Sequence, residues 1–233
     1  MLAPSSVTTP PSETALAAPR PIRGGLPAKN PDFTGREPLL AALADTLQTS
    51  SAVSVVPQAL HGLGGVGKTQ LATEYAYRHA DDYWLVWWMT AESAAQVRGS
   101  LAQLAQRLGM PVGQDMKQTT ALVLEALSAS PFRWLLVYDN AEGPEVLTDL
   151  VPSTGVGHVI VTSRNNAVWS ARGNAIEVDV FERSESIQLL RRHGRSIGHG
   201  DADKLADKLG DLPLALEQAA IWHATTGMPV SEY

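Results

Sequence analysis

Residues 62–69 read Gly-Leu-Gly-Gly-Val-Gly-Lys-Thr and fit the spacing Gly-x-x-x-x-Gly-Lys-[Ser/Thr]. Glycines in this pattern let successive backbone N–H groups curve around phosphate oxygens without a side-chain clash. Lys68 adds a positive charge at the β- and γ-phosphates of a nucleotide, and the Thr69 hydroxyl is a suitable ligand for Mg²⁺. This segment, called the P-loop below, is therefore predicted to bind nucleotide phosphates.

The residues on either side favour this interpretation over a glycine-rich turn without a ligand. Apolar residues at 53–56 and 59–60, interrupted by Pro57, predict a strand before the P-loop. Residues 70–77 have helical spacing, with Leu71 and Tyr75 facing inward. The N-terminal amides of such a helix, together with its dipole, favour a bound anion.

An acid that completes a nucleotide site is predicted at Asp139, where the apolar run 133–138 ends. In P-loop proteins an acid at the end of a strand beside the loop holds Mg²⁺, the Walker B role. Taken alone the pattern is weak, because apolar strands often end in Asp before a turn. Asn140 follows, and an amide cannot act as a general base, so Glu142 is the candidate for that role.

A cation is predicted at the same edge of the sheet. Residues 158–163 form another apolar strand, and Arg164 comes directly after it. A guanidinium at that position is able to reach a γ-phosphate and to register its presence. The alternative is that Arg164 forms a surface ion pair with a carboxylate. This alternative would be favoured if the P-loop and the strand that ends in Asp139 were missing.

Composition excludes several other classes of protein. The 233 residues carry a net charge of −6, which argues against a direct nucleic-acid surface, and 44% apolar residues suffice for a sizeable core. The absence of cysteine excludes disulfides, thiolate metal sites and cysteine nucleophiles. Neither a membrane-spanning run nor a signal peptide is present, so we expect a cytoplasmic protein without a membrane partner. The basic cluster at 191–195 is interpreted as a solvated helix end.

The chain divides into three parts by composition. Residues 1–31 are rich in proline and are expected to form a flexible leader or linker. Residues 32–181 alternate predicted strands and helices, which indicates an α/β nucleotide-binding domain with a parallel sheet. Residues 182–233 have only helical patterns, so we expect a small helical domain there.

Five segments follow one another along the chain: Phe33-Thr34-Gly35-Arg36-Glu37, the P-loop, residues 135–140, residues 161–164 and Gly210-Asp211-Leu212-Pro213-Leu214-Ala215-Leu216. In this order they resemble the NB-ARC family of STAND-class ATPase switches, which includes plant resistance proteins and many bacterial regulators. The residues within the segments are most similar to those of actinobacterial NB-ARC proteins with tetratricopeptide repeats.

The resemblance implies a P-loop NTPase fold, with a five-stranded parallel sheet in the order 5-1-4-3-2, followed by the helical subdomain ARC1. It also implies a role for each matching position. Phe33, Thr34 and Arg36 would lie on the adenine side, and Pro213 would pack against the base. The phosphates would be held by Gly64, Gly65, Val66, Gly67, Lys68, Thr69 and Gln70. Thr69 and Asp139 would hold Mg²⁺, and Arg164 would act as a sensor.

The function expected from these features is an ATP- and ADP-binding signalling switch with slow ATP hydrolysis. In this hypothesis Lys68, Asp139 and Arg164 carry the catalysis, and the nucleotide lies between the P-loop domain and ARC1. No winged-helix motif precedes Tyr233, so protein partners or self-assembly are expected through regions outside this chain. The alternatives are the nucleotide-binding module of a transcription regulator, and a P-loop motor or kinase, which should turn over at ~1 s⁻¹ or faster.

Overall fold

The computed structural model describes residues 19–49, 56–165, 169, 175–194, 197–228 and 230. The described residues form a six-stranded sheet in which every pair of neighbouring strands is parallel. The order across the sheet is β1-β3-β4-β5-β2-β6. The strands are β1 (Ile22–Gly24), β2 (Gln58–His61), β3 (Leu85–Thr90), β4 (Trp134–Asp139), β5 (His158–Ser163) and β6 (Ala175–Glu177).

The five strands expected from the sequence are β2 to β6, and they follow one another as the family order requires. The count of five is wrong, because β1 adds a sixth strand at the edge beside β3. This strand lies within the proline-rich residues that were expected to form a leader. It is held by Arg23, whose guanidinium donates to the carbonyls of Ala80, Tyr83 and Trp84. Part of the predicted first strand, residues 53–55, lies outside the described residues.

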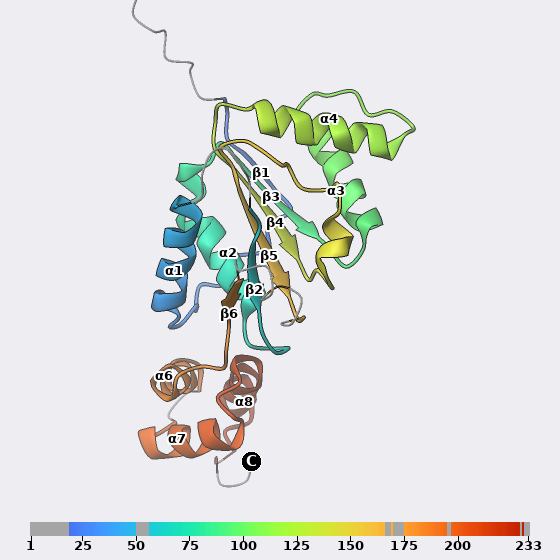
Figure 1. The fold of residues 1–233 in the computed structure, drawn as a ribbon. Helices are drawn as coiled ribbons and strands as arrows, with labels where there is room; N and C mark the ends of the chain where they lie inside the picture. The colour runs from blue at the N-terminus through green and yellow to red at the C-terminus, as the bar shows by residue number, and fades with distance from the viewer. Residues whose placement is uncertain are drawn as a thin grey trace, which may run out of the picture.

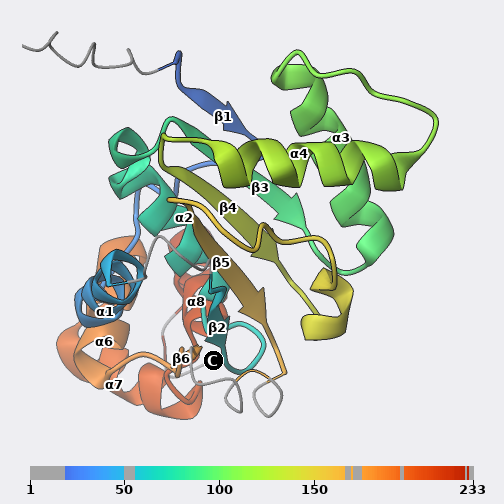
Figure 2. The same ribbon diagram turned by 45° about the horizontal axis from the view of Figure 1, so that its top comes forward.

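Helices cover both faces of the sheet, as Figures 1 and 2 show. One face carries α1 (Glu37–Gln48) and α2 (Lys68–Arg78), and the other carries α3 (Ala94–Arg107) and α4 (Met116–Ala129). Successive residues of a strand point to opposite faces of the sheet. In β4, Leu136 and Tyr138 pack toward α3 and α4, whereas Leu135 and Val137 pack toward α1 and α2. Both faces of this strand are therefore buried. Two short 3₁₀ segments lie on different faces: η1 (Ala80–Asp82) contacts α2, and Leu147 of η2 (Pro144–Leu147) packs in the core on the α3 and α4 side.

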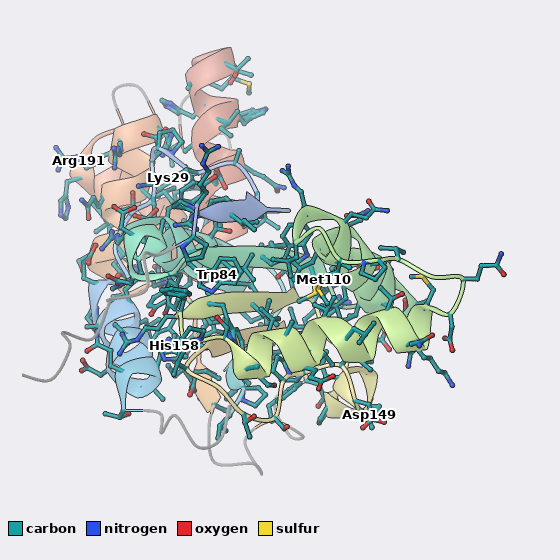
Figure 3. All side chains as sticks on the ribbon, turned by 90° about the horizontal axis from the view of Figure 1, so that it is seen from above. Lys29, Trp84, Met110, Asp149, His158 and Arg191 are labelled. Atoms are coloured by element: carbon teal, nitrogen blue, oxygen red, sulfur yellow. The ribbon has the colours of Figure 1, made fainter. Side chains whose placement is uncertain are left out.

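The last three helices form a separate cluster beyond β6 (Figure 1). These helices are α6 (Arg183–His193), α7 (His199–Lys208) and α8 (Pro213–Thr226), and they share an apolar core that includes Leu190, Leu205 and Leu216. Figure 3, seen from above, shows Arg191 of this cluster on the side opposite Met110, which follows α3. None of the described helices combines the length and the apolar character needed to cross a lipid bilayer.

Candidate nucleotide-binding site

The P-loop joins the end of β2 to the start of α2, which is the strand–loop–helix context expected from the sequence. Its backbone adopts left-handed conformations at Gly65 and Gly67, with φ of 81° and 95°. A residue with a Cβ atom is strained in this region, so glycine is required at both positions. Gly67 precedes the first residue of α2, so the loop lies at the N-terminus of a helix, where backbone N–H groups point at an anion.

Lys68 is the first residue of α2, and only 8% of its surface is exposed. Its ammonium group donates hydrogen bonds to the carbonyls of Gly62 and Leu63, at 2.8 and 2.7 Å. Burial lowers the pKa of this amine, the nearby charge of Arg164 lowers it further, and Asp139 opposes both effects. The three groups thus influence one another electrostatically, as expected of groups that share one anion site.

Asp139, at the end of β4, is connected to the P-loop by a direct hydrogen bond. Its Oδ1 accepts from the hydroxyl of Thr69 at 2.9 Å and from that of Thr162 at 2.5 Å. Thr162 in turn accepts from the backbone N–H of Asn140 at 2.8 Å. Within the described part of the chain no cluster of three or more His, Cys, Asp or Glu side chains could hold a metal ion. The Thr69–Asp139 pair instead offers the oxygen donors that Mg²⁺ uses together with phosphate.

These groups surround a cavity of about 460 Å³. The cavity is lined by the following sequence-predicted residues: Phe33, Thr34, Arg36, Gly64, Gly65, Val66, Gly67, Lys68, Thr69, Gln70, Arg164 and Pro213. Asp139 is outside this lining, but Thr69, to which it is hydrogen-bonded, and its neighbour Asn140 belong to it. The structure therefore brings together residues that are separated by up to 180 positions in the chain.

Arg36, which was predicted to lie on the adenine side, lines the cavity, but its guanidinium contacts protein groups. It donates to the carbonyls of Val66 and Asp179, at 3.2 and 2.6 Å, and stacks on the ring of Phe181 at 4.7 Å. The Arg36 backbone N–H donates to the carboxylate of Glu185 in α6 at 2.6 Å. Arg36 thus joins the P-loop to the segment that leads into the three C-terminal helices.

The N-terminus of α8 meets the P-loop directly. The N–H of Leu214 donates to the carbonyl of Gly65 at 3.2 Å, and a Cβ on Gly65 would lie 3.3 Å from the Cβ of Leu214. Pro213 stands at the first position of α8, where a missing N–H costs nothing.

Several cavity residues were not predicted from the sequence. They are Asn30, Asp32, Asn140, Thr162, Phe181, Leu189, His193, Leu214 and Glu217. Leu214 belongs to the segment 210–216 that carries the family resemblance, whereas Leu189, His193 and Glu217 follow an ordinary helical pattern without a distinguishing signal.

The sequence is similar to one family model and to several curated proteins. The family model described as the NB-ARC domain matches residues 36–196. A nucleotide-binding leucine-rich repeat (NLR)-like protein of Hyaloscypha variabilis is 28% identical over 95% of the chain, and regulatory protein AfsR of Streptomyces griseus is 30% identical over 84%. Regulatory protein AfsR of Streptomyces coelicolor is 30% identical over 90% of the chain. The chain spans only 25%, 21% and 22% of the length of these three curated relatives.

Solved structures with the same fold include two archaeal proteins. The Walker-type ATPase PABY2304 of Pyrococcus abyssi superposes with a TM-score of 0.61 at 13% identity, covering 90% of this chain and 71% of that one. Cdc6p of Pyrobaculum aerophilum superposes with a TM-score of 0.62 at 17% identity, covering 85% and 65%. At this level of identity the likeness concerns the fold alone, and the fold is that of the P-loop ATPases.

Proposed function

The chain belongs to the NB-ARC family, and from this premise we propose that it is an ATP- and ADP-binding signalling switch with slow ATP hydrolysis. In this proposal residues 32–181 form the nucleotide-binding domain, and residues 182–233 form a helical subdomain that closes over the nucleotide. The observation that carries the proposal is the hydrogen bond from Leu214 of α8 to Gly65 of the P-loop, beside a cavity lined by both parts. One ligand in that cavity contacts both, so its phosphates can bias their relative orientation.

Each residue has a definite task in this proposal. The P-loop amides and Lys68 hold the phosphates, and Arg164 registers the γ-phosphate at the end of β5. Phe33, Thr34 and Pro213 enclose the base. The hydroxyl of Thr69 and the carboxylate of Asp139 would hold Mg²⁺, which neutralises phosphate charge when it is bound.

The test is nucleotide binding by calorimetry to the wild-type chain and to Lys68→Ala. Removing the ammonium leaves the phosphates without their principal charge partner, so we expect the affinity for ATP and ADP to fall by about 100-fold or more. Lys117→Ala, at an exposed position in the first turn of α4, is the control and should bind as the wild type does. Equal affinities of wild type and Lys68→Ala would reject the site.

The relatives named regulatory protein AfsR favour a place for this module within a longer regulator. Since the chain spans about a fifth of their length, the remainder of such a protein would supply its signal input and its output. Steady-state turnover separates this reading from a motor or kinase, for which rates of ~1 s⁻¹ or more are expected. A turnover far below that value supports a switch.

A further inference from the structure

Asn140 occupies a position of the site where P-loop hydrolases commonly need an acid. It follows Asp139 at the end of β4, adopts a left-handed backbone with φ of 63°, and lines the cavity. An amide cannot take a proton from water at neutral pH, so Asn140 itself cannot act as the general base. The hydrolysis proposed above therefore requires a base from elsewhere in the chain.

The side chain of Asn140 holds a carboxylate. Its Nδ2 donates a hydrogen bond to Oε1 of Glu92 at 2.9 Å, across 48 positions of the sequence. Glu92 lies two residues after β3, the strand that pairs with β4. The two strand ends are in register, because Thr90 pairs with Asp139 and the N–H of Ala91 donates to the Asp139 carbonyl at 2.7 Å. The Glu92 carboxylate is thus fixed at the same edge of the sheet as the Walker B acid.

The acid that sequence reasoning favoured is less well connected. Glu142 is exposed, and in the described part of the chain no hydrogen bond ties its carboxylate to the cavity or to Asn140. Ala141, which precedes Glu142, is tied to the end of β5, because its N–H donates to the Thr162 carbonyl and its carbonyl accepts from the Ser163 hydroxyl. Glu142 itself does not line the cavity. Of the two carboxylates, Glu92 is therefore the one joined to a cavity-lining group.

We propose that Glu92, oriented by Asn140, is the general base of ATP hydrolysis in this chain; this inference rests on the proposed function. In the step, the oxygen of a water molecule forms a bond to the γ-phosphorus, and the bond from that phosphorus to the β–γ bridging oxygen breaks. The bridging oxygen leaves with the electron pair as part of ADP. The Glu92 carboxylate accepts the proton that the water loses, so the products are ADP, phosphate and one proton.

Glu92 is exposed and lies outside the cavity lining, so it would act on the attacking water through one further water while it stays hydrogen-bonded to Asn140. General bases act within hydrogen-bond distance of the attacking water or through one further water, and the distances often shorten once substrate is bound. Asn140 is a positioning residue in this scheme, since it contacts the base rather than the water. Its left-handed backbone, which Asn tolerates better than most residues, aims the amide toward Glu92.

The experiment compares single-turnover hydrolysis of ATP, with protein in excess, against ATP affinity measured on the same preparations. Glu92→Gln retains the shape of the side chain but cannot accept the proton, so hydrolysis should slow by about 100-fold or more while the affinity stays that of wild type. Asn140→Gly keeps the left-handed backbone without strain and should slow hydrolysis less. In the double variant the two losses should not add, because both act through one carboxylate.

Glu125→Gln, on the exposed face of α4, is the matched control and should leave both quantities unchanged. Wild-type hydrolysis by Glu92→Gln would overturn the assignment, as would a loss seen in Glu142→Gln but not in Glu92→Gln. A wild-type chain that binds ATP and hydrolyses none of it would also overturn it, leaving in place only the nucleotide-binding part of the proposed function. Failure of the wild type to bind ATP would instead reject the proposed function.

Discussion

At the scale of single residues, Arg36 shows how a side chain assigned to the ligand can instead connect parts of the protein. Only 7% of its surface is exposed, and its guanidinium is shared between the carbonyls of Val66 and Asp179 and the ring of Phe181. A lysine has neither the planar fork nor the stacking surface for these contacts. Arg36 is therefore a structural link between the P-loop and the C-terminal helices, whatever nucleotide contact it adds.

Replacing this residue tests that link. Arg36→Lys leaves a buried carbonyl without its donor, so we expect the free energy of unfolding to fall by ~1–3 kcal/mol in urea titrations. Arg107→Lys, at an exposed position at the end of α3, should change it by no more than ~0.5 kcal/mol. If both variants unfolded at the same urea concentration, Arg36 would not carry this structural role.

His158, labelled in Figure 3, is a residue whose titration should be visible in stability. Its Nδ1 lies 2.7 Å from the hydroxyl of Tyr83, which lies 3.1 Å from that of Tyr75. Burial, with a smaller effect from Arg133, lowers the pKa of His158 from 6.5 to about 4. Between these two pH values the unfolded chain binds more protons than the folded chain. The contribution of the neutral His158 side chain to stability is therefore complete above pH 6.5 and is lost as the pH falls toward 4.

We therefore expect the wild type to lose stability between about pH 7 and about pH 5, and His158→Gln to show a flatter dependence over that interval. Urea unfolding at both pH values measures the difference. The control is His199→Gln, at an exposed position in the first turn of α7, which should retain the wild-type slope. Identical slopes for wild type and His158→Gln would show that this histidine is not the group responsible.

At the scale of elements, strand β1 depends on a close contact that only glycine permits. A Cβ on Gly24 would stand 2.1 Å from a ring carbon of Trp87, and that ring is held by a hydrogen bond from its N–H to Ser100 at 3.0 Å. Gly24→Ala should therefore displace the strand and cost ~1–3 kcal/mol of unfolding free energy in urea. Gly99→Ala in α3, where a Cβ meets open space, should instead gain ~0.5–1 kcal/mol. A neutral Gly24→Ala would show that β1 does not rest on this contact.

Strand β1 could not be predicted from the sequence, in contrast to the central strands of the sheet. Strands β3, β4 and β5 contain consecutive apolar residues at 85–89, 134–138 and 159–161, as burial on both faces favours, so they were predictable. Strand β1 is three residues long and carries no such pattern, because its stability comes from Arg23 and from the ring beneath Gly24. Local periodicity cannot report a contact between residues 60 positions apart.

The residues of the candidate site likewise include some that a local sequence pattern predicts and some that it does not. The P-loop residues, Asp139 and Arg164 were predicted because their chemistry is tied to a local motif or to the end of a strand. Glu92, the base proposed above, was not predicted, although an acid two residues after a buried strand was a visible signal. Its partner is 48 positions away, and only the register of β3 against β4 brings the two together.

At the scale of the whole molecule, the C-terminal helices are tied to one another by a shared apolar core and by one arginine. Arg183 of α6 forms ion pairs with Asp203 and Asp207 of α7 and with Asp211 before α8, at 3.1, 3.2 and 2.9 Å. The links from these helices to the rest of the described chain include the Leu214–Gly65 hydrogen bond, the contacts of Arg36 and the Arg192–Asp32 ion pair at 3.3 Å. Because these links lie beside a cavity that both parts line, we propose that a bound nucleotide biases the orientation of the helices.

The nucleotide dependence of that orientation can be measured by fluorescence energy transfer, because the sequence contains no cysteine to interfere with labelling. Dyes on Gln103→Cys in α3 and Lys208→Cys in α7 report the sheet domain and the C-terminal helices, both sites being exposed. A tenfold difference between ATP and ADP in their preference for one orientation of the C-terminal helices changes the free-energy difference between the orientations by ~1.4 kcal/mol. The distribution of transfer efficiencies should then differ visibly between samples with ADP and samples with a non-hydrolysable ATP analogue. Dyes on Gln103→Cys and Glu125→Cys, both within the sheet domain, should show no such difference. Equal distributions with the two nucleotides, in a chain shown to bind both, would mean that the cavity holds nucleotide without acting as a switch.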